Sequence, residues 1–256
     1  MTQVVTIRNV HIGEGIPKII VPIVDQTRDS ILEKAIVLED MPVDAVEWRA
    51  DFYQDVFDTD KVLATARSLR AVLPDMPLLF TLRTKAEGGE KDISTAGYIA
   101  LNKAVAQSGA VDIMDVELFS GDETVRECIC NIHEAGGYVI ASSHDFSGTP
   151  AKEELVRRLR KMQDMDADIL KIAVMPNSAE DVLTLLSATN EMYVKYAKRP
   201  LVTISMSSKG AISRLAGEFF GSSMTFGTAG QASAPGQIPV ERLSSILHTL
   251  HKSGDL

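Results

Sequence analysis

The stretch ADILKIAVM (167–175) carries a single lysine, Lys171, inside a run of apolar residues. Such a continuous run is typical of a strand covered on both faces, as in a parallel sheet between helices. Seven further runs have this length and character, namely KIIVPIV (18–24), DAVEWRA (44–50), PLLFTLR (77–83), DIMDVEL (112–118), YVIASSHD (138–145), PLVTISM (200–206) and MTFGTA (224–229). With residues 168–174 they predict eight parallel strands.

Amphipathic segments lie between these runs and predict helices. NSAEDVLTLLSATNEMYVKYA (177–197), for example, opens with Asn177 or Ser178 as an N-cap and has an acidic first turn. Eight strands alternating with eight helices predict an α/β fold of the (β/α)₈ or TIM-barrel type. The main alternative is a doubly wound open sheet, but the turn after the first strand, VDQTRDS (24–30), lacks the glycines usual there. The opening VVTIRNVHIGEG (4–15) predicts a β-hairpin that plugs the bottom of the barrel.

Length and composition agree with one soluble domain over residues 1–256. A barrel of this kind needs about 250 residues, and the chain has 256, of which 45% are hydrophobic and 24% charged. Neither a signal peptide nor a membrane span is apparent, so we expect a cytoplasmic location. The net charge of −9 argues against a nucleic-acid partner but leaves an anionic small-molecule substrate open. Cys128 and Cys130 lie two apart on a predicted helix and are expected to be reduced thiols, one of them buried.

Lys171 is the most informative candidate residue. Active sites of such barrels lie at the carboxyl ends of the strands, and an ammonium ion within an apolar strand is costly to bury. Burial lowers the pKa of a lysine and frees its amine to attack a carbonyl. The structural alternative is a lysine paired with a buried acid such as Asp115 or Glu117.

His144 ends the strand that precedes the strand of Lys171, so the two side chains are expected to converge. Histidine is the usual proton shuttle near neutral pH, although a strand-end histidine taken alone is more often a satisfied polar residue. Glu87 and Asp115 are each candidates to orient its ring from behind. The remaining histidines, His11, His133, His248 and His251, fall on the hairpin or on helices and are expected to be surface or packing residues.

Arg49, Arg83 and Arg214 are expected at the same end of the barrel, where they can bind an anion. Glu47 and Arg49 lie two apart on one strand, so they share a face and are expected to form a pair. The loop GTAGQASAPGQIPV (227–240) is either a plain connection or a mobile lid that carries Ser233 and Gln237 over the mouth of the barrel.

Six segments in order resemble the type I 3-dehydroquinate dehydratases, and the bacterial enzymes in particular. They span most of the chain and are EWRADFY (47–53), LLFTLRTKAEGGE (78–90), SSHDF (142–146), ILKIAVMP (169–176), GAISRLAGEFFGS (210–222) and SAPGQI (233–238). The resemblance implies a cofactor-free and metal-free barrel, expected as a homodimer, that converts 3-dehydroquinate to 3-dehydroshikimate in the shikimate pathway.

The resemblance also implies a role for each site residue. Lys171 corresponds to the lysine that forms an imine with the substrate ketone, His144 to the general acid and base, and Glu87 to its carboxylate partner. Substrate-binding roles fall to Arg214 for the carboxylate, to Glu47, Arg49 and Arg83 for the ring hydroxyls, to Met206 and Phe226 for the apolar wall, and to Ser233 and Gln237 for the lid. Asp115 is implied to support the site from behind.

Two alternatives remain open at this point. A Schiff-base aldolase or transaldolase would share the strand lysine, and the segment SSKG (207–210) faintly resembles its phosphate site. A non-catalytic barrel would bind a polyhydroxy acid without forming a covalent adduct.

Overall fold

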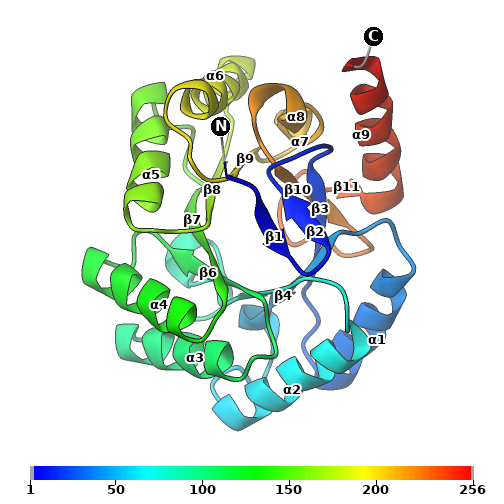
Figure 1. The fold of residues 1–256 in the computed structure, drawn as a ribbon, viewed down its shortest axis with the longest axis vertical. Helices are drawn as coiled ribbons and strands as arrows, with labels where there is room; N and C mark the ends of the chain where they lie inside the picture. Colours follow the sequence, from blue (N-terminus) through cyan, green and yellow to red (C-terminus); the bar gives the residue numbers. More distant parts are fainter. Residues whose placement is uncertain (1–2, 255–256) are drawn as a thin grey trace.

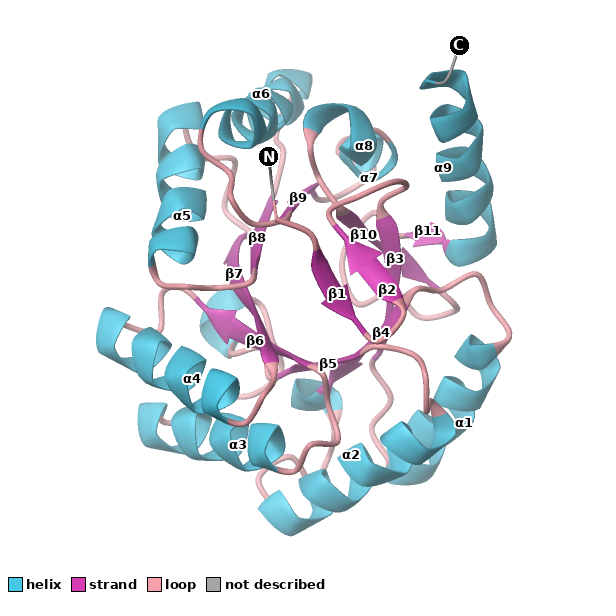
Figure 2. Cartoon of the chain, viewed as in Figure 1, coloured by secondary structure: helices cyan, strands magenta, loops and turns pink. Residues whose placement is uncertain are grey.

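The computed structural model describes residues 3–254 and contains a sheet of nine parallel strands that curls into a barrel inside a ring of helices (Figures 1 and 2). The strand order is β11-β10-β3-β4-β5-β6-β7-β8-β9. Each predicted strand is present, trimmed by at most two residues at an end, as β3 (Lys18–Ile23), β4 (Ala45–Arg49), β5 (Leu78–Thr81), β6 (Ile113–Glu117), β7 (Tyr138–Asp145), β8 (Ile169–Val174), β9 (Leu201–Ser205) and β10 (Met224–Thr228). The predicted barrel is confirmed.

The barrel closes between β9 and β10 by contacts that differ from a regular ladder. The amide of Ser223 donates to the carbonyl of Leu201 at 2.7 Å, and the amide of Thr203 donates to the Oγ of Ser222 at 3.1 Å. A serine hydroxyl therefore takes the place of a backbone carbonyl at the seam, and the ring of strands is complete (Figure 2).

The helices lie outside the strands and cover the outer face of the barrel (Figure 1). Ser178 is the N-cap of α6 and forms a capping box with Asp181, which confirms one of the two predicted caps. The helices are α1 (Arg28–Glu39), α2 (Thr59–Val72), α3 (Thr95–Gln107), α4 (Asp122–Glu134), α5 (Lys152–Asp164), α6 (Ala179–Lys195), α7 (Ala211–Leu215), α8 (Gly217–Phe220) and α9 (Val240–Gly254).

Two features differ from the predicted pattern of eight simple repeats. The helical connection after β9 is split into α7 and α8, which meet at Ala216. A short strand, β11 (Ile238–Pro239), also pairs with the end of β10. A strand of two residues carries no periodic signal, so no pattern in the sequence separates β11 from its loop.

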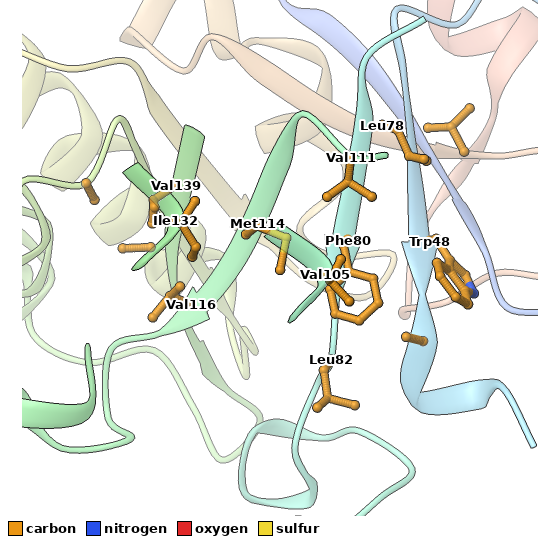
Figure 3. Close-up of a cluster of buried hydrophobic side chains, with 14 of the residues drawn as sticks. Trp48, Leu78, Phe80, Leu82, Val105, Val111, Met114, Val116, Ile132 and Val139 are labelled. Carbon is orange, nitrogen blue, oxygen red and sulfur yellow. The ribbon is translucent and has the colours of Figure 1, made fainter. Parts of the chain in front are cut away.

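The main core lies between the strands and the helices. In the part shown in Figure 3, Trp48 of β4 and Phe80 of β5 pack edge to face with ring centroids 5.4 Å apart. Val105 of α3 and Ile132 of α4 face the same layer from the helices. The alternate residues of each strand point the other way, into the barrel.

A second core fills the amino end of the barrel. Strands β1 (Val5–Ile7) and β2 (Val10–Ile12) form an antiparallel hairpin, and its buried side chains Ile7 and Ile12 pack with inward residues of the barrel strands such as Ile20 and Leu79. The predicted plug is confirmed. Because apolar side chains fill the amino end of the barrel, a polar site can form only at the opposite, carboxyl end.

Within residues 3–254, no helix is long and apolar enough to cross a membrane. Both cysteines are free thiols, Cys128 buried and Cys130 exposed. The prediction for the cysteines is confirmed.

Candidate active site

The site is a cavity, partly open to solvent, at the carboxyl ends of the strands. Every predicted site residue except Asp115 lines it. The wall contains Glu47, Arg49, Arg83, Glu87, Gly88, His144, Phe146, Lys171, Ala173, Ile204, Met206, Arg214, Phe226, Ser233, Ala234 and Gln237.

Lys171 lies in the middle of β8, and its side chain points into the barrel with 4% of the residue exposed. Its Nζ lies 4.4 Å from the centre of the Phe226 ring, 3.7 Å from Asp115 Oδ2 and 3.9 Å from Glu47 Oε1. These carboxylates are beyond hydrogen-bond distance, and burial lowers the pKa of Lys171 in spite of them. The structural alternative, a lysine paired with a buried acid, is therefore met in part. Lys171 forms long ion pairs with Asp115 and Glu47, whereas Glu117 pairs with Arg83.

His144 and Glu87 form a buried pair beside Lys171. Glu87 Oε2 accepts the backbone N–H of His144 at 3.0 Å and lies 2.9 Å from its Nδ1. In the tautomer in which Nδ1 donates to Glu87, Nε2 keeps its lone pair and faces the cavity as a base. Burial and the nearby positive charges of Arg83, Lys171 and Arg49 lower the pKa of His144 well below its ordinary value. Burial raises the pKa of Glu87 to about 8.

Arg83 is the hub of a buried ionic network. Its two terminal nitrogens lie 2.8 Å from Asp115 Oδ2, 2.9 Å from Glu117 Oε1 and 3.5 Å from Glu87 Oε2. Asp115 also accepts the hydroxyl of Ser142 at 2.7 Å. The expectation that Asp115 orients the His144 ring is wrong, because its two oxygens are taken up by Arg83 and Ser142 behind the cavity wall.

The predicted Glu47–Arg49 pair is also wrong. Arg49 instead forms a two-point ion pair with Asp51, with both N···O distances 2.8 Å. The extended backbone ends at Arg49, and the 3₁₀ turn η1 (Ala50–Phe52) brings Asp51 back to the guanidinium. Glu47 accepts the hydroxyl of Thr81 at 2.8 Å and still faces the cavity.

Arg214 is a buried cation that forms no ion pair within the described residues 3–254. It is 1% exposed, and its terminal nitrogens donate only to the carbonyls of Phe226 at 3.3 Å and Pro235 at 3.1 Å. Its Nε is buried without a hydrogen-bond partner among residues 3–254. Burial lowers its pKa to about 10. A buried guanidinium that faces a cavity in this way is suited to an anionic ligand.

The loop after β10 folds over this arginine. Ser233 and Gln237 join across the loop, since Gln237 Oε1 accepts the amide of Ser233 at 2.8 Å and its Nε2 donates to Ser233 Oγ at 3.0 Å. Pro235, between them, accepts from both Arg214 and the amide of Ser207. Met206 and Phe226 supply apolar wall nearby.

Several residues of the site were not predicted. Ala173 and Ser142 follow from strand alternation with Lys171 and His144, so the pattern could have indicated them. Gly88 and Phe146 lie in loops, where no periodicity indicates which side chains face a cavity. No group of three or more histidine, cysteine or acidic side chains suited to a metal ion occurs in the described part of the chain.

Comparison with known proteins gives the same assignment over nearly the full chain. The family model for type I 3-dehydroquinase matches residues 19–254. A 3-dehydroquinate dehydratase of Bacillus licheniformis is 52% identical over 99% of this chain and 100% of its own, and one of Escherichia coli O17:K52:H18 is 50% identical over 98% and 100%. A crystal structure of the type I 3-dehydroquinate dehydratase of Clostridium difficile, with covalent modified comenic acid, superposes with a TM-score of 0.97 at 50% identity and covers 99% of this chain and 100% of that chain. The chain belongs to the type I 3-dehydroquinase family.

Proposed function

We propose that this chain dehydrates 3-dehydroquinate to 3-dehydroshikimate in the shikimate pathway, through an imine on Lys171. The observation that carries the proposal is the position of this amine, buried inside the barrel in a cavity that it shares with His144. Membership of the family supports the substrate.

The proposed chemistry uses the two groups in turn. The neutral amine of Lys171 attacks the C3 ketone, and loss of water gives an iminium ion that acidifies the C2 proton. Nε2 of His144 removes this proton, and the resulting enamine expels the C1 hydroxyl, which leaves as water with the proton from the imidazolium. Water then hydrolyses the product imine and restores the amine. A placed acid and base of this kind contributes about 10²–10⁴-fold to the rate.

The charges around the cavity fit this substrate. Arg214 is proposed to bind the carboxylate, because this buried cation has no counter-charge in the part of the chain that the structure describes. Glu47, Arg49 and Arg83 are proposed to face the ring hydroxyls, with Arg83 already held by its carboxylates. Ser233 and Gln237 are proposed to close over the ligand against Met206 and Phe226.

The proposal extends to location and assembly. We place the protein in the cytoplasm as a homodimer with a small-molecule substrate and without a nucleic-acid or membrane partner. The exposed apolar side chains Tyr193, Val194 and Phe219, on α6 and α8, offer a surface for a second copy. One barrel domain over residues 1–256, working without a cofactor, remains part of this proposal.

Borohydride trapping tests the proposal. Incubation with 3-dehydroquinate and borohydride is expected to add one substrate-derived mass to the protein, located by peptide mapping at Lys171. Lys171→Ala is the control and should gain no mass. An adduct that persists at another residue in the control would refute the assignment.

The role of His144 needs a separate measurement. His144→Ala should still form the trapped adduct but should turn over at least about 100-fold more slowly, as followed by the ultraviolet absorbance of the conjugated enone product. Turnover at the wild-type rate would remove His144 from the mechanism.

The aldolase-type alternative is not favoured. The lysine of its faint phosphate motif, Lys209, donates instead to the carbonyl of Asn177 at 2.8 Å.

A further inference from the structure

Gly88 and Phe146 touch at the mouth of the cavity. Gly88 follows Glu87 at the end of the 3₁₀ turn η2 (Lys85–Glu87) and has a φ of +82°. A Cβ built on Gly88 would lie 2.3 Å from Cε2 and 2.6 Å from Cζ of the Phe146 ring. The ring therefore occupies the space that any other residue at position 88 would need.

The same two segments also meet at the proposed catalytic pair. Glu87, next to Gly88, accepts the amide of His144 and lies 2.9 Å from its ring Nδ1. His144 lies two residues before Phe146. The loop and the end of β7 are thus joined by two hydrogen bonds of Glu87 and by one apolar contact. The turn also has backbone hydrogen bonds, such as that from the Gly89 amide to the Thr84 carbonyl at 2.8 Å. A three-residue 3₁₀ turn has little stability of its own, so a packing contact adds to what holds Glu87 in place.

We propose that Gly88 and Phe146 are positioning residues, whose packing holds Glu87 against His144 and limits the access of water to the pair. This inference rests on the proposed function, since it assigns a purpose to the geometry of His144 and Glu87. Phe146 is suited to this purpose because it lines the cavity while 43% of it remains exposed at the rim.

Gly88→Ala is the direct test. The new methyl group should displace the Phe146 ring and lower kcat by about 10- to 100-fold, part of the contribution of a positioned acid and base. Phe146→Ala should act in the same direction. Because Phe146 is partly exposed, this variant also keeps the test available if Gly88→Ala does not fold.

The pH profile distinguishes positioning from general destabilisation. His144 is faced by Glu87, Arg83, Lys171 and Arg49, and burial is the largest cause of its low pKa. Water admitted by either substitution should raise that pKa toward its ordinary value. Since the base must be neutral, the acid limb of the kcat profile should move to higher pH, and an NMR titration of the His144 ring should move with it.

Gly136→Ala is the matched control. Gly136 has a φ of +80°, almost that of Gly88, but a Cβ there would meet no atom within 4 Å. This variant carries the same backbone strain without the contact, so it should keep the wild-type kcat and pH profile.

The double variant Gly88→Ala/Phe146→Ala completes a double-mutant cycle, which measures whether the effects of the two substitutions are independent. If the two residues act through one contact, the double variant should be no slower than Phe146→Ala alone. Losses that multiply, or a Gly88→Ala protein with wild-type kcat and pH profile, would overturn the inference. An inactive wild-type protein would instead refute the proposed function, and the NMR titration would still test the positioning.

Discussion

Two of the buried arginines of the site, Arg83 and Arg214, show how the surroundings of a cation indicate its role. Arg83 is held by the carboxylates of Asp115 and Glu117, with Glu87 slightly farther away. Arg214 is just as buried but donates only to backbone carbonyls. A cation compensated within the fold stabilises the fold, whereas an uncompensated cation is a cost that a ligand can remove.

Arg214→Met is therefore expected to separate stability from binding. The free energy of unfolding should stay unchanged or rise by up to about 1 kcal/mol, while the loss of charged hydrogen bonds, about 1.5–3 kcal/mol, lowers kcat/KM roughly 10- to 100-fold. Urea unfolding and steady-state kinetics measure the two effects.

Arg83→Met is the contrasting variant. It leaves buried carboxylates uncompensated and should destabilise the protein by about 3–5 kcal/mol. If Arg214→Met proved as destabilising as Arg83→Met, the reading of Arg214 as an uncompensated cation would be wrong.

Glu87 should make stability depend on pH. Its pKa rises from 4.5 to about 8 on folding because of burial. Between these values the folded protein binds more protons than the unfolded chain, so this group lowers the free energy of unfolding as pH rises through the window. Glu87→Gln lacks the effect. Its stability relative to wild type should increase from pH 5 to pH 8, by on the order of 2–4 kcal/mol.

Urea unfolding at pH 5, 6.5 and 8 measures this difference. Glu33→Gln, on the exposed face of α1, is the control for the chemical change alone. A Glu87→Gln curve parallel to that of wild type across the window would contradict the prediction.

Residue-level prediction from sequence worked inside the strands and failed beyond their ends. Lys171 could be identified because an apolar strand leaves only two directions for its side chain, inward or outward. The partner of Arg49 could not, because alternation stops where the backbone leaves the extended conformation at Arg49. For the same reason, the contact between Gly88 and Phe146 could not be predicted, since both residues lie beyond the end of a strand.

At the scale of elements, most of the barrel could be read from the sequence. Continuous apolar runs specify strands that are covered on both faces, and the N-cap Ser178 fixed the start of α6. The break between α7 and α8 and the two-residue strand β11 follow from tertiary contacts at the seam of the barrel. Such contacts leave no local pattern.

The hairpin of β1 and β2 is expected to serve stability and not catalysis. Ile12 is fully buried in the core at the amino end of the barrel, at the end opposite the cavity. Ile12→Ala should lower the free energy of unfolding by about 2–5 kcal/mol and leave KM unchanged. Thr6→Ala, an exposed change on the same hairpin, is the control. A large change in KM for Ile12→Ala would show that the plug communicates with the site.

At the scale of the whole molecule, the barrel brings together groups that are far apart in the chain. The cavity lining runs from Glu47 to Gln237 and draws on strands β4, β7, β8, β9 and β10 and on the loops that follow β5 and β10. The net charge of −9 does not oppose an anionic substrate, because the cations that matter are inside the barrel and shielded from the surface.

A ligand that spans this cavity should therefore stabilise the entire barrel. Reduction of the imine would join the substrate to Lys171 on β8, supply an anion to Arg214 and fill the space beneath the loop of Ser233. If these contacts together add more than about 2 kcal/mol to the free energy of unfolding, Tm should rise by more than about 5 °C for a chain of this size. Calorimetry of the trapped adduct against protein treated with borohydride alone measures the shift. The Arg214→Met adduct should show a smaller rise, because its carboxylate meets no cation. An adduct that forms at Lys171 and leaves Tm unchanged would mean that the buried cation and the open cavity do not limit the stability of the free protein.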